Sequence, residues 1–271
     1  MKNIKIPIFM YHEILDDNEK DPKVLSLMQS SYFVKKSVFE KQMGFLHEQG
    51  FKPISLYEVT DYLDKKDGFR MADKCLVITF DDGYMGNYKY AFPILKKFGF
   101  TATVFCTVKL IGEPYMMGWE ELKFLSQNGI SIQSHTLSHP FLGQLNDEQV
   151  NIELKSSKNI LESKLGARVD YISLPHGSNG KNYKQIASSL GFLGGCSSIA
   201  GLNDISVDRF FLRRILISGS YSLNKFKSIV LGRRSSILSI KFDKFMKTLG
   251  KKIMGEKVYY RIYNIIFRLK K

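Results

Sequence analysis

The sequence lacks the features of several large protein classes. No uninterrupted apolar run in its 271 residues approaches the roughly 18 residues of a membrane-spanning helix, which argues against an integral membrane protein. The N-terminal stretch is interrupted by Pro7 and has no small-residue cleavage site, so we expect no signal peptide and a cytoplasmic location. Only three cysteines are present (Cys75, Cys106 and Cys196), without a CxxC pair. They favour buried thiols in a reducing compartment over a disulfide framework or a thiolate metal site.

Acidic residues are scarce in one part of the chain only. Residues 1–220 contain 26 Lys and Arg against 24 Asp and Glu, whereas residues 221–271 contain 14 against 2. Twelve of the fourteen net positive charges therefore lie in the last fifth of the chain. We predict two parts, a nearly neutral domain over 1–220 and a basic extension over 221–271.

Short apolar segments alternate with amphipathic segments of helical period throughout residues 1–220. Strands are predicted at Ile6–Tyr11, Cys75–Thr79, Thr101–Cys106, Ile130–Ser134, Tyr171–Leu174, Phe192–Cys196 and Leu212–Ile217. Helices are predicted at Val38–Glu48, Leu56–Leu63, Tyr88–Phe98, Trp119–Gln127, Asp147–Lys164 and Tyr183–Ser189. This alternation is typical of parallel βαβ units, either in an open sheet or in a barrel. No GxGxxG or GxxxxGK[ST] follows a strand, and we favour an α/β barrel with its site at the carboxyl ends of the strands.

The apolar run that starts at Val77 ends in two adjacent carboxylates, Asp81 and Asp82, followed by a glycine. The turn at a strand end can bring both carboxylates into one pocket. There one could bind a metal ion while the other acts as a base, because the bound ion keeps their environments distinct. The alternative interpretation is a surface turn or a helix cap, for which Asp-Gly pairs are often used.

A second strand, Ile130–Ser134, is followed by His135 and His139. On a helical turn this spacing places both imidazoles on one face, as a divalent metal ion requires. A lone histidine is usually a core or surface residue, but here two of only five histidines fall together at a strand end. Two histidines and one carboxylate that leave open positions are typical of a catalytic metal site.

These two motifs resemble those of a known family. TFDDGY over residues 79–84 and SHTLSH over residues 134–139 are similar to the NodB-homology polysaccharide deacetylases, carbohydrate esterase family four. The YHEI opening and the segments FEKQMGFLHEQGF, AFPIL and WEEL are similar as well, so the resemblance covers roughly residues 5–218. It implies a deformed (β/α) barrel of about seven parallel strands that removes acetyl groups from N-acetylated sugars. It makes Asp81 the general base, and Asp82, His135 and His139 the ligands of a divalent metal ion, with zinc favoured.

The chemistry is consistent with these roles. An amide carbonyl is a poor electrophile and water is a poor nucleophile at neutral pH, and a divalent ion with open positions improves both. A base must take the proton of the attacking water, and an acid must protonate the departing amine.

Two later motifs depart from the family pattern. The Arg-x-Pro-aromatic-Gly motif is SLPHG over residues 173–177, so both the arginine and the aromatic residue are replaced. The late Leu-x-His segment has no histidine. We expect His12 to be the general acid and Arg214 to orient Asp81, with His176 as the rival acid. Substrate or oxyanion contacts are expected from Tyr84, Pro175, His176 and Gly177. The alternatives are a buried structural histidine for His12, an ion pair at the rim for Arg214 and a turn residue for His176.

The basic extension contains a predicted amphipathic helix. Its apolar arc holds Leu238, Phe242, Phe245, Met246, Leu249 and Ile253, and the opposite arc holds Lys241, Lys244, Lys247, Lys251 and Lys252. This pattern favours peripheral contact with an anionic membrane, at the inner face of the cytoplasmic membrane. Packing of the helix on the barrel or in a dimer is the alternative. Nucleic acid fits less well because the aromatic residues are segregated from the basic face.

The predicted function is therefore metal-dependent N-deacetylation of an N-acetylated sugar or glycan, in free, nucleotide-linked, lipid-linked or polymeric form, in surface polysaccharide assembly. Two alternatives remain. The first is a catalytically inactive family member that binds glycan or membrane, suggested by the lost arginine and late histidine. The second is hydrolysis of a different small amide on the same scaffold.

Overall fold

The computed structural model describes residues 4–21, 32–64 and 73–232. Seven parallel strands of its eight-stranded main sheet follow the order β10-β1-β5-β6-β7-β8-β9. The strands are β1 (Ile8–Tyr11), β5 (Cys75–Phe80), β6 (Ala102–Cys106), β7 (Ile130–Ser134), β8 (Tyr171–Ser173), β9 (Gly194–Cys196) and β10 (Ile215–Leu216). Leu212 bridges Cys196 in parallel, and β10 pairs with β1, so the segment leading into β10 contacts both edges of the curled sheet. The predicted deformed (β/α) barrel is confirmed.

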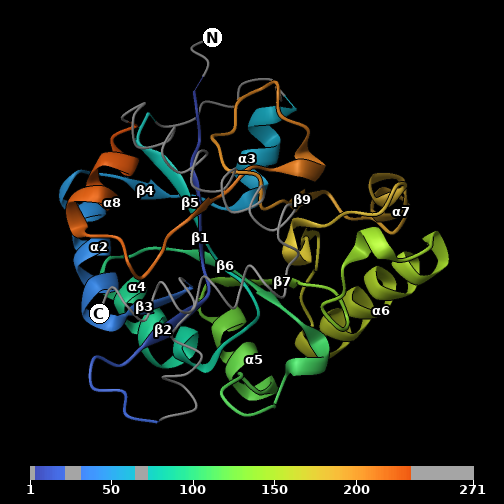
Figure 1. Cartoon of the computed structure of the whole chain (residues 1–271), viewed down its shortest axis with the longest axis horizontal. Coiled ribbons are helices and arrows are strands. Elements are labelled where there is room, and N and C mark those ends of the chain that lie inside the picture. Colours follow the sequence, from blue (N-terminus) through green and yellow to red (C-terminus); the bar gives the residue numbers. More distant parts are fainter. Residues whose placement is uncertain (1–3, 22–31, 65–72, 233–271) are drawn as a thin grey trace, which may run out of the picture.

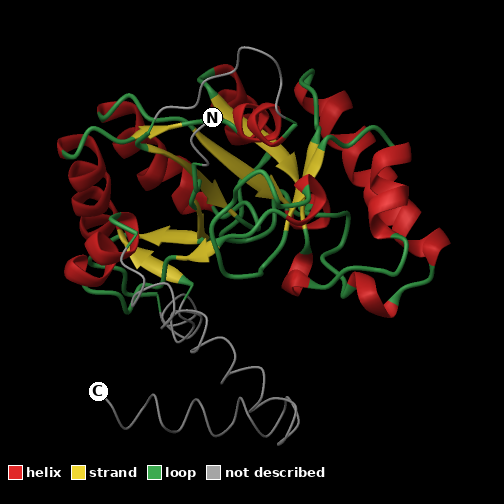
Figure 2. Cartoon of the chain, turned by 90° about the horizontal axis from the view of Figure 1, so that it is seen from above, coloured by secondary structure: helices red, strands yellow, loops and turns green. Residues whose placement is uncertain are grey.

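Helices surround this sheet (Figures 1 and 2). They are α2 (Lys36–Glu48), α3 (Leu56–Leu63), α4 (Phe92–Lys97), α5 (Trp119–Gln127), α6 (Asp147–Leu165), α7 (Tyr183–Ser189) and α8 (Leu223–Val230). A π-helical segment, Asn87–Ala91, leads directly into α4, so the predicted helix over Tyr88–Phe98 is one continuous element with a change of winding. In Figure 1, α2 and α8 lie together on one side of the sheet, and α6 and α7 lie on the other.

Several short elements were not predicted from the sequence. They are α8 and the strands β2 (Glu13–Leu15), β3 (Phe33–Lys35) and β4 (Lys52–Pro53). β2 and β3 form a small parallel sheet, and β4 pairs with β5. Strands of two or three residues are too short for a periodic pattern to reveal.

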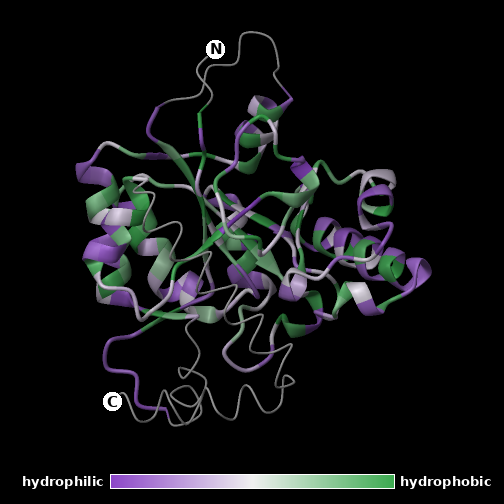
Figure 3. Cartoon of the chain, turned by 45° about the horizontal axis from the view of Figure 1, so that its top comes forward, coloured by the Kyte–Doolittle hydropathy of each residue, from purple (hydrophilic) through white to green (hydrophobic). Residues whose placement is uncertain are grey.

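Local sequence accounts for the main elements. All six residues of β5 are buried, as expected for a parallel strand that is covered on both faces. The helix α3 begins with a capping box between Ser55 and Glu58. The helix α6 ends at Gly166, whose φ of 64° is the left-handed conformation that glycine adopts most easily. In Figure 3 the strands at the centre are hydrophobic, and the helices around them carry hydrophilic residues.

The strand register brings the functional motifs to one end of the barrel. Tyr11 is paired with Phe80 in neighbouring strands, and Ser134 is paired with Ile172. The residues that follow β1, β5 and β7 therefore lie side by side with the last residue of β8. They are His12, the Asp81–Asp82 turn, His135 and Ser173.

The extension predicted for 221–271 is described only in part. The helix α8 is packed against α2, with Phe226, Ile229 and Val230 buried. The predicted amphipathic helix lies outside the described residues, as does most of the extension, so the division at residue 220 and the membrane contact stay predictions. Within the described ranges, none of the helices combines the length and the apolar character needed to cross a membrane.

Candidate active site

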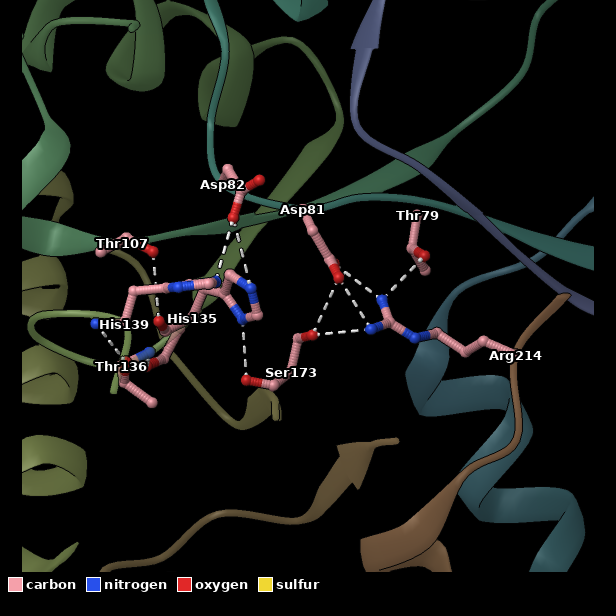
Figure 4. A network of polar contacts seen from close by, with 10 residues as sticks. Thr79, Asp81, Asp82, Thr107, His135, Thr136, His139, Ser173 and Arg214 are labelled. Carbon is pink, nitrogen blue, oxygen red and sulfur yellow. Dashed lines mark hydrogen bonds and ion pairs between the residues drawn. The ribbon is translucent and has the colours of Figure 1, made fainter. Parts of the chain in front are cut away.

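Asp82, His135 and His139 converge at the carboxyl end of the barrel (Figure 4). The Oδ1 atom of Asp82 lies 3.4 Å from the Nε2 atoms of both histidines, and the three ligand atoms lie within 4.8 Å of one another. A tetrahedral ion with bonds of about 2.1 Å separates its ligand atoms by about 3.4 Å. The geometry and the donor set, two imidazole nitrogens and one carboxylate oxygen, therefore fit a divalent metal ion.

Both imidazoles are suited to metal binding because they are neutral at pH 7. Burial lowers the pKa of His135 to about 4, and burial together with the neighbouring His135 and His176 lowers the pKa of His139 to about 3. The Nδ1 atom of His135 lies 2.9 Å from the carbonyl oxygen of Ser173. A proton on Nδ1 that donates to this oxygen leaves the Nε2 lone pair for a metal ion.

The pKa of Asp82 is shifted upwards, in contrast to those of the two histidines. Burial and the negative charge of Asp81 raise its pKa to about 7. The two adjacent carboxyl groups thus differ in their tendency to ionise before any metal ion binds. A positive ion at the site would favour the ionised form of Asp82.

The backbone is strained at this site. Within the described residues, five non-glycine residues have positive φ angles. Four of them belong to the site, namely Asp82 (73°), Thr136 (67°), His139 (62°) and His176 (59°). Such conformations persist where the surrounding contacts over-determine them, and they are concentrated at functional sites. The hydroxyl of Thr136 supports this turn by accepting a hydrogen bond from the His139 N–H at 3.0 Å.

Asp81 is paired with Arg214 inside the barrel. The two guanidinium nitrogens donate to its two carboxylate oxygens at 2.7 and 2.8 Å, and the exposed fractions are 3% for Asp81 and 1% for Arg214. Arg214 also donates to the hydroxyl of Ser173 and to the carbonyl oxygen of Ser197. Burial alone would raise the pKa of Asp81, but the positive charge of Arg214 holds it well below its ordinary value. The structure thus places Arg214 beside Asp81, as the sequence analysis expects.

Ser173 occupies the position at which the family pattern has its arginine. Its hydroxyl donates to Asp81 at 3.2 Å and accepts from Arg214 at 2.8 Å. The small side chain at the end of β8 leaves space for a guanidinium that enters from the start of β10. An arginine is therefore present beside Asp81, although it comes from a different strand.

His12 lies next to Asp81 because β1 and β5 are paired in register, and the Asp81 N–H donates to the carbonyl oxygen of Tyr11. The carbonyl oxygen of His12 accepts a hydrogen bond from the Asn87 side chain at 2.7 Å. Burial lowers the pKa of His12 to about 4, against the influence of Asp81. Among the described residues, its buried Nδ1 has no hydrogen-bond partner.

The remaining predicted residues surround the ligands. His176 lies in the 3-10 turn Pro175–Gly177 after β8, and its ring centroid is 4.6 Å from that of His139. The Gly177 N–H donates to the carbonyl oxygen of Leu174 and closes this turn. Tyr84 follows the Asp82 turn and is half-buried, and burial raises the pKa of its phenol.

Two supporting residues were not among the site residues predicted from the sequence. Glu153, on α6, accepts hydrogen bonds at 2.9 Å from the N–H groups of Leu137 and Ser138, so it holds the loop between the two candidate histidine ligands. Glu13 is buried against Gly86, at the start of the helix that follows the Asp81–Asp82 turn. Each contact joins two different elements of the fold. Glu13 belongs to the YHEI segment, but the sequence does not show that it is packed against Gly86.

Comparisons with known proteins agree with one another on the protein family. A family model described as polysaccharide deacetylase matches residues 70–194. The Bacillus subtilis (strain 168) protein named "Putative polysaccharide deacetylase YxkH" is 33% identical over 231 residues, which are 84% of this chain and 77% of that protein. The poly-beta-1,6-N-acetyl-D-glucosamine N-deacetylase of Escherichia coli (strain K12) is 25% identical, over 46% of this chain and 20% of its own length.

Solved structures agree with this family. The Streptococcus pyogenes deacetylase PplD, in complex with acetate, superposes with a TM-score of 0.76 at 28% identity, over 85% of this chain and 98% of that one. The fold is also similar to that of IcaB from Ammonifex degensii, with a TM-score of 0.69 at 22% identity over 84% and 96% of the two chains. From its relatives and its barrel, the chain belongs to the polysaccharide deacetylase family.

Proposed function

We propose that the protein is a metal-dependent hydrolase that removes N-acetyl groups from an N-acetylated sugar or glycan. The convergence of Asp82, His135 and His139 beside the ion-paired Asp81 carries this proposal. Relatives whose names specify N-deacetylation of poly-N-acetylglucosamine support the substrate class.

Asp82, His135 and His139 would hold the metal ion. The mixed imidazole and carboxylate set suits zinc, and other divalent ions also accept it. When bound, such an ion polarises an amide carbonyl and lowers the pKa of water from 15.7 to about 7. Within the described residues three side chains form this ligand set, which leaves positions for water and substrate.

Asp81 would act as the general base. Its low pKa keeps the carboxylate ionised at neutral pH, so that it can accept a proton. Arg214 holds both carboxylate oxygens, and Ser173 contacts one of them, so the side chain has a fixed orientation. Arg214 is thus a positioning residue for the base.

His12 would act as the general acid for the departing amine. It adjoins Asp81, whose charge partly counters the effect of burial on the His12 pKa. The free imidazole is neutral at pH 7, so His12 must gain its proton in the substrate complex. His176 is the competing candidate because its ring is packed against that of His139. A His12→Gln variant with full activity, beside an inactive His176→Gln variant, would assign the acid to His176.

Metal content and acetate release test the proposed function. The purified full chain, loaded with zinc and dialysed, should retain one ion, and His135→Ala should lose it. His47→Ala is the matched control because His47 is exposed on α2. Asp81→Asn should keep the ion but release no acetate from N-acetylglucosamine oligosaccharides. A wild-type chain that binds no divalent ion would overturn the hydrolase proposal and favour an inactive, glycan-binding family member.

A further inference from the structure

Three rings form a row that leads away from the candidate metal centre. The ring of His176 makes an edge contact with His139, with centroids 4.6 Å apart, and lies flat on Phe141, with centroids 3.8 Å apart and an interplanar angle of 11°. His139 is a candidate ligand of the metal ion, whereas His176 and Phe141 do not belong to the candidate metal-binding group.

The two outer rings of this row are more exposed than the ring of His139. The side chain of His139 is 27% exposed, whereas His176 is an exposed residue and Phe141 is 39% exposed. Because His176 covers one face of the phenyl ring, a ligand can approach Phe141 only from its edges or its other face. A large apolar ring at this position costs hydration free energy in the free protein, and a ligand that covers it would recover that cost.

Hydrogen bonds hold the two turns that carry Phe141 and His176. The carbonyl oxygen of Phe141 accepts a hydrogen bond from the Gln144 N–H, which closes the 3-10 turn Leu142–Gln144. The N–H of Gly143, in the middle of this turn, donates to the hydroxyl of Ser178 at 3.0 Å, so this turn is tied to the one that carries His176. These hydrogen bonds reduce the loop entropy that would be lost on binding.

We propose that Phe141, stacked on His176, binds the pyranose ring adjacent to the sugar that carries the reacting N-acetyl group. The axial C–H groups of a pyranose carry small positive charges, and they match the negative face of an aromatic ring. This subsite rests on the proposed function, and it selects a substrate of at least two linked sugars over a monosaccharide.

Chain-length dependence tests this subsite. Acetate release would be measured from N-acetylglucosamine and from its dimer, trimer and tetramer. Phe141→Leu keeps the apolar volume but removes the aromatic face, and we expect kcat/KM for the oligomers to fall about tenfold with the monosaccharide unaffected. Phe141→Trp should retain the preference for oligomers. Phe124→Leu is the matched control, because Phe124 is 42% exposed and lies on α5. Equal losses at every chain length, or no loss, would overturn the subsite.

A binding measurement separates this subsite from the catalytic proposal. In Asp81→Asn, calorimetry with the tetramer should show weaker binding once Phe141→Leu is added, even if no variant releases acetate. A UDP-linked N-acetylglucosamine that binds as tightly as the tetramer, and equally depends on Phe141, would assign the ring to a nucleobase and refute the glycan subsite.

Discussion

Replacement of Arg214 by methionine would leave the Asp81 carboxylate buried without its partner. The pair is bidentate, with nitrogen–oxygen distances of 2.7 and 2.8 Å, and both side chains are almost completely shielded from water. Removing one member of a buried ion pair typically costs about 3–5 kcal/mol. We therefore expect Arg214→Met to lower the free energy of unfolding at pH 7 by about this amount.

The pH dependence of this loss identifies its cause. In the wild type the folded-state pKa of Asp81 lies below its unfolded value of about 3.9. The pair therefore contributes its full stability above that unfolded value, and the contribution is lost as the pH falls towards the folded pKa. In Arg214→Met, Arg214 no longer offsets the effect of burial, so we expect the folded pKa of Asp81 to rise above the unfolded value. Protonation of Asp81 at low pH then removes the unpaired buried charge. The difference in the free energy of unfolding between the wild type and Arg214→Met should therefore be smaller at pH 4 than at pH 7.

Urea unfolding at pH 7 and pH 4 measures this effect. The matched control is Arg209→Met, because Arg209 forms an ion pair with Asp64 at 2.8 Å in which both side chains are more than one third exposed. The control should change the free energy of unfolding by less than about 1 kcal/mol. The double variant Asp81→Asn/Arg214→Met should be more stable than Arg214→Met. An equal loss at both pH values would refute the electrostatic reasoning.

A second prediction is that the arginine beside Asp81 can be moved from position 214 to position 173. Arg214→Met should raise the pKa of Asp81 and lower acetate release at pH 7, because a smaller fraction of the base is ionised and its carboxylate is no longer held in one orientation. Since the Ser173 hydroxyl contacts both members of the pair, an arginine at this position can approach Asp81 from β8. The double variant Ser173→Arg/Arg214→Met should recover part of the activity. Ser173→Arg alone should be unstable, because two guanidinium groups would then share one carboxylate.

Three further predictions concern the surroundings of this pair. Because the pKa of Asp82 is about 7, a metal ion that binds below pH 7 must displace the proton of this carboxyl group. Zinc affinity, measured by competition titration, should therefore fall about tenfold for each pH unit below 7. Above pH 7, Asp82 should contribute no pH dependence. Gly86→Ala should lower the free energy of unfolding by about 1–3 kcal/mol, because the added Cβ would lie 1.9 Å from the carbonyl oxygen of Ile14. An unchanged midpoint of urea unfolding would contradict this close contact. Thr136→Val removes the hydroxyl that accepts from the His139 N–H and should weaken zinc binding by about tenfold, whereas unchanged affinity would show that the turn needs no such support.

Much of the barrel and the candidate ligands could be predicted because the signals are local. The predicted bounds of β7, α3, α5 and α7 agree with the structure at both ends, since each element has a clear period and a clear terminal residue. Asp82, His135 and His139 each follow a strand closely. Parallel strands align their carboxyl ends, so short motifs at separate strand ends must meet.

Elements that depend on contacts between distant segments were harder to predict from the sequence. The helix Phe92–Lys97 is preceded by a π-helical segment, and β10 has only two of the six predicted residues, because pairing with β1 and not the apolar pattern defines its length. The roles of His12 and His176 stay predictions. Their positions relative to Asp81 and His139 are geometric facts that do not choose between the two acids.

The amino-acid sequence by itself determined the alternation of strands and helices, the two strand-end motifs and the charge asymmetry of the chain. Arg214 was expected beside Asp81, but only the tertiary structure showed that the two residues, 133 positions apart, form a buried ion pair with two hydrogen bonds. It also decided that Phe141 lies flat on His176, and that Glu153 holds the loop between two candidate ligands. Local patterns depend on neighbouring residues along the chain, whereas these contacts depend on how whole elements pack, which no short stretch of sequence specifies.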